Sequence, residues 1–344
     1  MISDKQNGKR FSFREIFFYS ISVVVGLTLL IYTFRGVGLD EVLIHFNDVN
    51  IFYLVLFVFV VFLGAFIRAW RWKYMIESFK SDVKIVNLFS AVIIGYGVNV
   101  ILPRFGEVAR AMSIGSLEGI SRVSSLGTVV IERVLDLIFL ILTVLIGLSM
   151  FREVLESEYP WIYSSIYIGI AAFVASILVL GLIIKYQRKV LVLIDKLFLK
   201  MNFKILNKAT LFTSKIIDGF DSIKSRKNLL LVIFMSPIIW ITYAVGAYLG
   251  LYMMNMQKIV PVDFSFGWII MSITTFGILI PTPGSTGSYH AFCKSVLTMI
   301  LGFAVDISLA YALLTHFLST LPFLLISIIL FFMHQRKKRN FSQS

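Results

Sequence analysis

The chain has 344 residues, of which 58% are hydrophobic and 15% charged, and its mean hydropathy is +0.88. No soluble core of this length can hide so many apolar side chains, so the composition excludes a soluble globular protein and indicates an all-α polytopic membrane protein. The net charge of +13 could indicate nucleic-acid binding, but the placement of the basic residues argues against that class.

Six segments are long and apolar enough to cross a bilayer as helices, which takes about 20 residues each. In chain order they are 15–34, 52–68, 124–150, 160–184, 229–253 and 307–333. Two further apolar segments, 85–103 and 264–304, are interrupted by proline and glycine, which gives eight hydrophobic segments in all. The first segment is too long for a cleaved signal peptide and is predicted to stay in the protein.

The basic residues gather on one side of these segments. The stretches 1–14, 68–84, 104–122, 185–227 and 336–339 hold 27 of the 32 Lys and Arg residues. Because cytoplasmic loops carry the excess of positive charge, both termini and the linker 185–227 are predicted to be cytoplasmic. The linker mixes apolar and lysine positions at helical spacing, so we expect a basic amphipathic helix lying on anionic inner-leaflet lipid.

The orientation of the full spans sets the topology of the two interrupted segments. The segment 85–122 must begin and end in the cytoplasm, and 264–304 must begin and end outside. Both are too apolar for exposed loops, so we predict two re-entrant helical hairpins. A span, a broken hairpin and a span occur at 52–150 and again, inverted, at 229–333, within one membrane domain covering 1–344. Inverted repeats with interrupted helices are typical of transporters.

The first hairpin and the next span carry charges inside apolar sequence. Pro103 is expected to end the first arm of the hairpin, and Gly106 to let the backbone turn. Charged side chains inside a bilayer are costly, so these should face the bundle interior. Arginine binds phosphate with two parallel hydrogen bonds. The predicted site for a lipid headgroup phosphate comprises Asn99, Arg104, Glu107, Arg110, Glu132, Arg133 and Asp136.

Two other interpretations of these charges stay open at this point. They could be mutually neutralising ion pairs that only fix helix packing, or the carboxylates could relay protons. Metal and cofactor sites are not expected, since the four histidines are scattered and Cys293 is the single cysteine.

Several motifs together resemble one family. "NVILPRFGEVAR", then "SSLGTVVIERVLD", and "RAWRWKYM" at 68–75 are similar to elements of the membrane domain of lysylphosphatidylglycerol synthetases and of related stand-alone, flippase-like proteins of the UPF0104 type. "PTPGSTG" resembles the turn of the family's second hairpin, at Pro281, Pro283, Gly284 and Gly287. The resemblance covers nearly the whole chain. This sequence departs from the family pattern at three positions: Arg104 follows Pro103 without the usual spacer, Ser285 stands where a second glycine is common, and His290 stands roughly where an acidic residue often follows.

The resemblance implies that the protein translocates a phospholipid or polyprenyl-phosphate-linked headgroup across the bacterial cytoplasmic membrane. We do not expect it to be an enzyme, although enzymatic alternatives stay open below. The soluble aminoacyl-transfer domain of the bifunctional synthetases is not expected after the basic tail. The sequence does not name the lipid, the direction of transport or the energy source, and a homo-oligomer stays open.

Other functions are weighed against transport. A non-transporting scaffold of envelope or lipid biosynthesis is one of them. An intramembrane serine protease is another, because Ser285, Ser288 and His290 lie in a membrane-embedded break and His316 lies on the next helix. A lipid-linked glycosyltransferase is disfavoured because the chain has no Asp-x-Asp metal motif.

Overall fold

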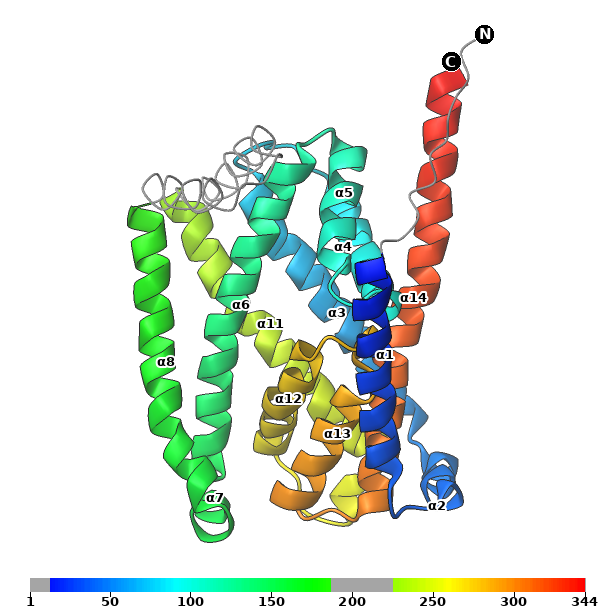
Figure 1. Cartoon of the computed structure of the whole chain (residues 1–344), viewed down its shortest axis with the longest axis vertical. Helices are drawn as coiled ribbons and strands as arrows, with labels where there is room; N and C mark the ends of the chain where they lie inside the picture. The colour runs from blue at the N-terminus through cyan, green and yellow to red at the C-terminus, as the bar shows by residue number, and fades with distance from the viewer. Residues whose placement is uncertain (1–12, 187–224, 344) are drawn as a thin grey trace.

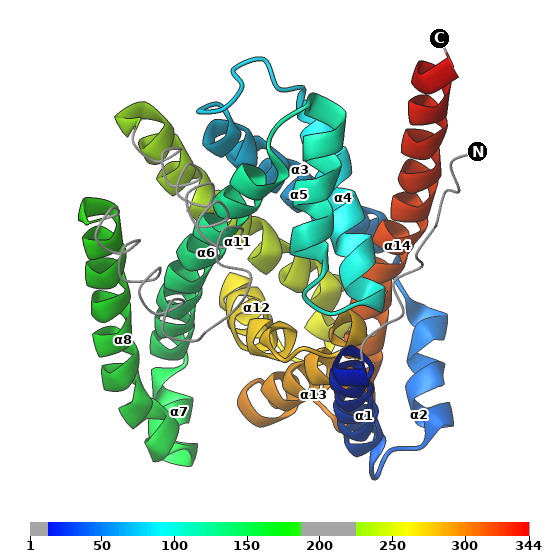
Figure 2. The same cartoon turned by 45° about the horizontal axis from the view of Figure 1, so that its top comes forward.

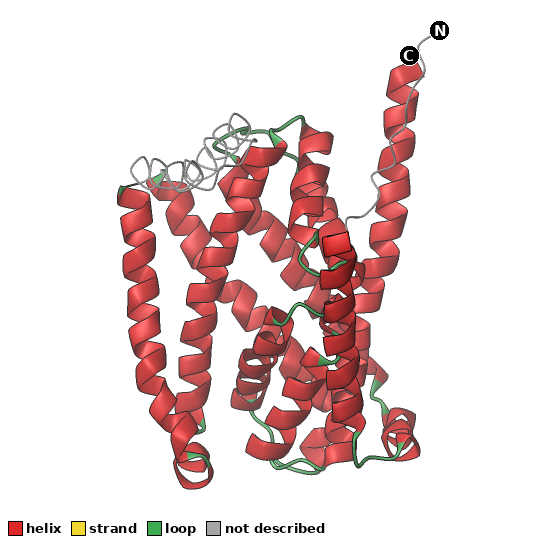
Figure 3. Ribbon diagram, in the orientation of Figure 1, coloured by secondary structure: helices red, strands yellow, loops and turns green. Residues whose placement is uncertain are grey.

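The computed structural model describes residues 13–186 and 225–343, and all regular structure in these ranges is helical (Figure 3). The all-helical class is therefore confirmed for this part of the chain. Most of the predicted amphipathic linker, residues 187–224, lies outside the described residues. The longer helices are α1 (Phe13–Phe34), α3 (Ile51–Ile76), α4 (Ile85–Ile101), α5 (Gly106–Glu118), α6 (Arg122–Met150), α8 (Pro160–Lys185), α11 (Arg226–Met253), α12 (Phe264–Leu279), α13 (Ser288–Ser295) and α14 (Val305–Gln343).

Shorter elements connect these helices. On the face opposite the chain termini lie α2 (Leu39–Ile44) and α7 (Arg152–Glu158), at the bottom of Figure 1. The remaining short elements are η1 (His45–Asp48), η2 (Met256–Lys258), η3 (Pro283–Ser285) and the π-helical turn η4 (Val296–Ile300).

Four described helices, α1, α3, α11 and α14, are long and apolar enough to cross a membrane. A fifth span results if α6 and α7, which meet at a bend of 77°, are counted together. The helix α8 occupies the fourth predicted span, 160–184, but its fully described apolar part, Ile166–Val179, is shorter than a span. Six full spans therefore stay a prediction.

Each interrupted segment forms a pair of helices that pack against each other. The first pair is α4 and α5, and the second is α12 and α13, joined through η3. At 17 and 16 residues, α4 and α12 are about 25 Å long, which is less than the ~30 Å of a hydrocarbon core. The first pair lies in the upper part of Figure 1 and the second in the lower part. How deeply each pair enters a bilayer stays a prediction.

The two halves of the chain contact each other reciprocally. The helices α3 and α11 pack together along much of their length. The first arm of each hairpin also packs on the last helix of the other half, α4 on α14 and α12 on α6, as Figure 2 shows. These contacts between the two halves hold the two hairpins together.

Two apolar clusters support the two hairpins. One surrounds α4 and α5 and includes Trp72 and Leu88, and the other surrounds α12 and α13 and includes Leu251 and Tyr311; all four side chains are fully buried. A polar side chain buried between these clusters is costly unless it has a protein partner or a ligand.

Candidate functional site

A cluster of charged side chains is buried where α3, α5, α6 and α11 meet. We call it the arginine cluster; its members are Arg68 and Arg71 of α3, Glu107 and Arg110 of α5, and Glu132, Arg133 and Asp136 of α6. Arg68 and Arg71 are three residues apart on their helix, and Glu132 and Asp136 are four apart on theirs. These spacings bring each pair onto one helix face.

Glu132 is the centre of the arginine cluster, and its side chain is fully buried. One carboxylate oxygen accepts hydrogen bonds from Arg68 Nη1 at 2.7 Å and from Arg110 Nη1 at 3.0 Å. The other oxygen accepts from Arg110 Nη2, so this arginine binds the carboxylate with both of its terminal nitrogens. Arg133 Nη2 donates to the first oxygen at 3.2 Å. Glu132 thus neutralises charge from three helices.

Asp136, one turn further along α6, is the second acceptor. Its two oxygens accept from Arg68 Nη1 at 3.1 Å and from Arg71 Nη2 at 2.8 Å. The helix α11 completes the polar shell, because Tyr243 Oη accepts from Arg68 at 3.1–3.2 Å and Ser236 Oγ accepts from Arg71 at 2.9 Å. The cluster therefore ties α11 to the first half of the chain.

An aromatic side chain covers part of the cluster. The guanidinium carbon of Arg110 lies 3.9 Å from the ring centroid of Trp72, a cation–π arrangement. The indole Nε1 of Trp72 donates to Thr128 Oγ1 at 2.8 Å, which fixes the ring between α3 and α6.

The arginine cluster has more positive than negative charge. It contains four arginines and three carboxylates, so its formal charge is +1. The Nε atoms of Arg71, Arg110 and Arg133 are buried without a hydrogen-bond partner among the described residues, as is Glu107 Oε2. A buried donor without an acceptor is costly. The cluster consequently has the charge and the donors to accept one more anionic group.

Arg133 is the accessible member of the four arginines. Its side chain is 39% exposed, whereas those of Arg68, Arg71 and Arg110 are at most 7% exposed. Its contact with Glu107 is long, at 3.8 Å, and its contact with Asp136 is 3.5 Å. Arg133 is therefore the arginine that an incoming anion can reach first.

Two of the predicted headgroup residues lie at the tip of the first hairpin rather than in the cluster. Asn99 Oδ1 accepts from the backbone N–H of Gly106 at 2.8 Å and thereby joins the two arms. A Cβ atom on Gly106 would collide with the backbone oxygen of Gly95 and with Asn99, so the crossing of the arms requires glycine here. Arg104 has a left-handed backbone, with φ of 68°, and its guanidinium donates to the carbonyl of Leu279 at the end of α12.

The predicted turn residues of the second hairpin all lie between α12 and α13. Pro281 directly precedes Thr282, Pro283 opens η3, and Gly284 and Gly287 have positive φ angles of 58° and 83°. Gly284 also lies close to Val100 of α4, so the tips of the two hairpins touch here as well as at Arg104. The tips of the two hairpins therefore meet, and Arg104 is exposed at this contact.

Neutral hydrogen bonds hold this second break. Thr282 Oγ1 and Ser288 Oγ are 2.9 Å apart, His316 Nε2 lies 2.7 Å from the carbonyl of Gly284, and His290 Nδ1 accepts from the N–H of Gly287. Within the described ranges no hydrogen bond joins a serine of this break to either histidine. The described residues also include no group of three His, Cys, Asp or Glu side chains placed to hold a metal ion. The geometry thus gives no support to a serine–histidine nucleophile.

Sequence reasoning did not assign Arg68, Arg71, Ser236 and Tyr243 to the site. The two arginines belong to the predicted cytoplasmic basic stretch 68–84, whereas in the structure they lie in α3, which continues to Ile76, and are buried. Their spacing of three on an apolar helix next to Trp72 was the available signal. No local sequence feature marks Ser236 or Tyr243 as site residues, because only the packing of α11 brings them to the arginine cluster.

Comparison with known proteins gives one family and one curated relative. The family described as the lysylphosphatidylglycerol synthase TM region matches residues 19–327. The UPF0104 membrane protein MJ1595 of Methanocaldococcus jannaschii is 30% identical over 131 residues, which are 37% of this chain and 39% of that protein. The match therefore spans about two fifths of the relative's length. No solved structure matches the chain.

Proposed function

This chain belongs to the lysylphosphatidylglycerol synthase TM region family, and on that premise we propose that it moves the phosphate-bearing headgroup of a phospholipid or polyprenyl phosphate across the membrane. The arginine cluster would be the headgroup site.

The observation that carries the proposal is the uncompensated charge of the cluster. A set of ion pairs that served packing alone would be most stable when neutral and fully hydrogen-bonded, because unpaired buried charge is destabilising. Here a formal charge of +1 and three unpaired guanidinium N–H groups are retained. A phosphate monoanion would neutralise this positive charge and accept hydrogen bonds from the unpaired N–H groups. Its approach would begin at Arg133.

The meeting of the two hairpin tips supports a transport step. In this structure Arg104 joins the first tip to Leu279, and Gly284 lies against Val100. A headgroup leaving the cluster toward the opposite face would have to pass these contacts. We infer that the two halves of the chain rock against each other and separate the tips, while the acyl chains stay in the bilayer.

Purified protein in liposomes tests the proposal. The assay measures transfer of fluorescent lipids between leaflets, with anionic, cationic and polyprenyl-phosphate lipids offered separately. The variant Arg133→Gln removes one accessible charge, and we expect at least a tenfold slower transfer of the preferred lipid. The matched control is Lys258→Gln, which removes one exposed charge in η2, far along the chain from the cluster.

Two results would contradict the proposal. If the wild-type protein transfers no lipid of the panel faster than protein-free liposomes, the transport function fails, and a scaffold becomes the better account. If the wild-type protein transfers lipid and Arg133→Gln does so equally fast, the cluster only fixes helix packing.

A further inference from the structure

The first helix contacts the bundle at the second hairpin. Ser22 Oγ of α1 donates to the carbonyl of Pro281, and a Cβ atom on Gly26 would lie 3.1 Å from the carbonyl oxygen of Thr286. Further along α1, Lys294 Nζ of α13 donates to the carbonyl of Thr33 at 2.7 Å. These contacts run from the hairpin tip toward the end of α1, so α1 lines one side of the second hairpin.

The length of α1 places its end at the level of lipid headgroups. The part of the helix from Ser22 to Arg35 is about 20 Å long, at about 1.5 Å per residue. Half of a hydrocarbon core is about 15 Å. If the hairpin tips lie near the middle of the bilayer, as two re-entrant hairpins that touch at their tips would require, Arg35 reaches the outer interface.

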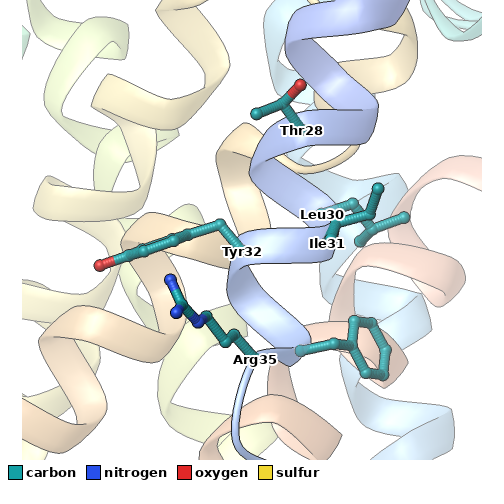
Figure 4. Close-up of a pocket in the computed structure, with 6 residues that line it drawn as sticks. Thr28, Leu30, Ile31, Tyr32 and Arg35 are labelled. Carbon is teal, nitrogen blue, oxygen red and sulfur yellow. The ribbon is translucent and has the colours of Figure 1, made fainter.

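An open surface region of about 720 Å³ lies along this end of α1. Its lining residues are Thr28, Leu30, Ile31, Tyr32, Phe34 and Arg35. Thr28, Tyr32 and Arg35 recur at intervals of four and three and therefore lie on one helix face. Figure 4 shows the side chains of Tyr32 and Arg35 extending to the same side of α1.

The chemistry of the lining changes along the helix axis. Ile31 is 72% exposed and Tyr32 is 65% exposed, as expected for side chains that contact acyl chains. The exposed Arg35 follows at the end, and its guanidinium has no hydrogen bond or ion pair in the part of the chain that the structure describes. Arginine and tyrosine can both donate hydrogen bonds to a phosphate oxygen.

We propose that this end of α1 binds an anionic phospholipid of the outer leaflet, with its phosphate at Arg35 and Tyr32 and an acyl chain along the exposed apolar residues of the helix that precede them. An apolar surface that ends in an unpaired cation matches a molecule with an apolar chain and an anionic head. The site rests on the proposed function for its role, since it lies at the outer end of the hairpin past which the headgroup would leave. Its existence can be tested separately.

Native mass spectrometry of the full-length protein in detergent measures the binding directly. The protein is titrated with phosphatidylglycerol or with phosphatidylcholine, and bound lipids are counted at each concentration. The variants are Arg35→Gln, Arg35→Lys, the charge-matched outer-face control Lys258→Gln, and Arg133→Gln to remove the contribution of the arginine cluster. Melting temperature reports whether each variant folds.

We expect Arg35→Gln to weaken one phosphatidylglycerol site by about tenfold and to leave phosphatidylcholine binding and melting unchanged. Arg35→Lys should keep part of the affinity, because it keeps the charge but loses the paired donors. Lys258→Gln should bind as the wild-type protein does, and Arg35→Gln should have the same effect in the Arg133→Gln background.

Three results would overturn the proposal: equal phosphatidylglycerol binding by wild type and Arg35→Gln, an equal loss in Lys258→Gln, or full competition by free glycerol phosphate, which would indicate a site for a soluble anion. Failure of lipid transfer in liposomes with intact binding at Arg35 would refute the transport function alone.

Discussion

Replacing Glu132 with glutamine removes the central charge of the arginine cluster with almost no change in shape. The carboxylate is fully buried and accepts from Arg68, Arg110 and Arg133. An amide keeps one acceptor oxygen, but its NH₂ group faces guanidinium donors, and the formal charge of the cluster rises from +1 to +2. Removing one partner of a buried ion pair costs about 3–5 kcal/mol. That is a large fraction of a typical folding free energy of about 5–15 kcal/mol.

The measurement is thermal unfolding in detergent at neutral pH. At about 2 °C per kcal/mol, Glu132→Gln should melt roughly 6–10 °C below the wild type. The control is Glu156→Gln in the ion pair with Arg152, whose side chains are 41% and 61% exposed. Exposed pairs of this kind contribute about 0.3–0.5 kcal/mol, so the control should melt within about 1 °C of the wild type.

A double-mutant cycle with Arg110→Gln separates the ion pair from general damage to the core. Because Arg110 and Glu132 bind each other with two hydrogen bonds, the double variant should be less destabilised than the sum of the single variants. Strict additivity, or a Glu132→Gln melting point equal to that of the wild type, would refute the assignment of a buried, coupled cluster.

Three other predictions follow from the hairpins. Gly106→Ala should lower the melting point strongly because its Cβ would meet backbone atoms of the other arm. Gly246→Ala, whose Cβ would have only Val60 nearby, at 3.9 Å, should be neutral or slightly stabilising. Equal melting points of the two variants would argue against the close crossing of the arms. Burial alone would raise the pKa of Glu118, but hydrogen bonds from Lys80, Asn87 and the Lys84 backbone hold it below its ordinary value. The stability from Glu118 is therefore present above its unfolded pKa and lost as pH falls through the lower folded value. Wild type should thus lose more stability than Glu118→Gln between about pH 5 and pH 3 in melting experiments, and parallel curves would count against it. Arg104→Ala removes the donor to the end of α12 and should loosen the two tips, measured as faster hydrogen exchange at 99–106 and 279–287; unchanged exchange would show that this contact does not hold them.

The positions of the helices could be predicted from the sequence because the signals are local. Apolar runs mark the helices, and Pro103 and Pro281 mark the two breaks, which the structure places between α4 and α5 and between α12 and α13. The end of α3 was less predictable. The sequence shows a charged stretch after residue 68, and only the carboxylates of α6 allow Arg68 and Arg71 to continue inside the helix and be buried.

The composition of the candidate site was predictable in part. Arg110, Glu132, Arg133 and Asp136 come together because the second arm of the hairpin returns beside α6. Arg104 does not join them, since the left-handed turn at this residue directs its side chain to a carbonyl of α12. The backbone conformation of Arg104 thus decides which groups its side chain binds. The spacing of residues in the sequence does not predict that conformation.

The uncompensated positive charge of the arginine cluster has an electrical consequence. With the predicted orientation, an anionic headgroup taken up at the cluster would start in the more negative compartment of a cell. Carrying one negative charge outward across the membrane potential releases about 2.3 kcal/mol per 100 mV. The same charge carried inward would require that energy. A binding site selective for anions on this side would therefore let the membrane voltage drive export, and the rate in liposomes should follow the sign of an imposed potassium diffusion potential.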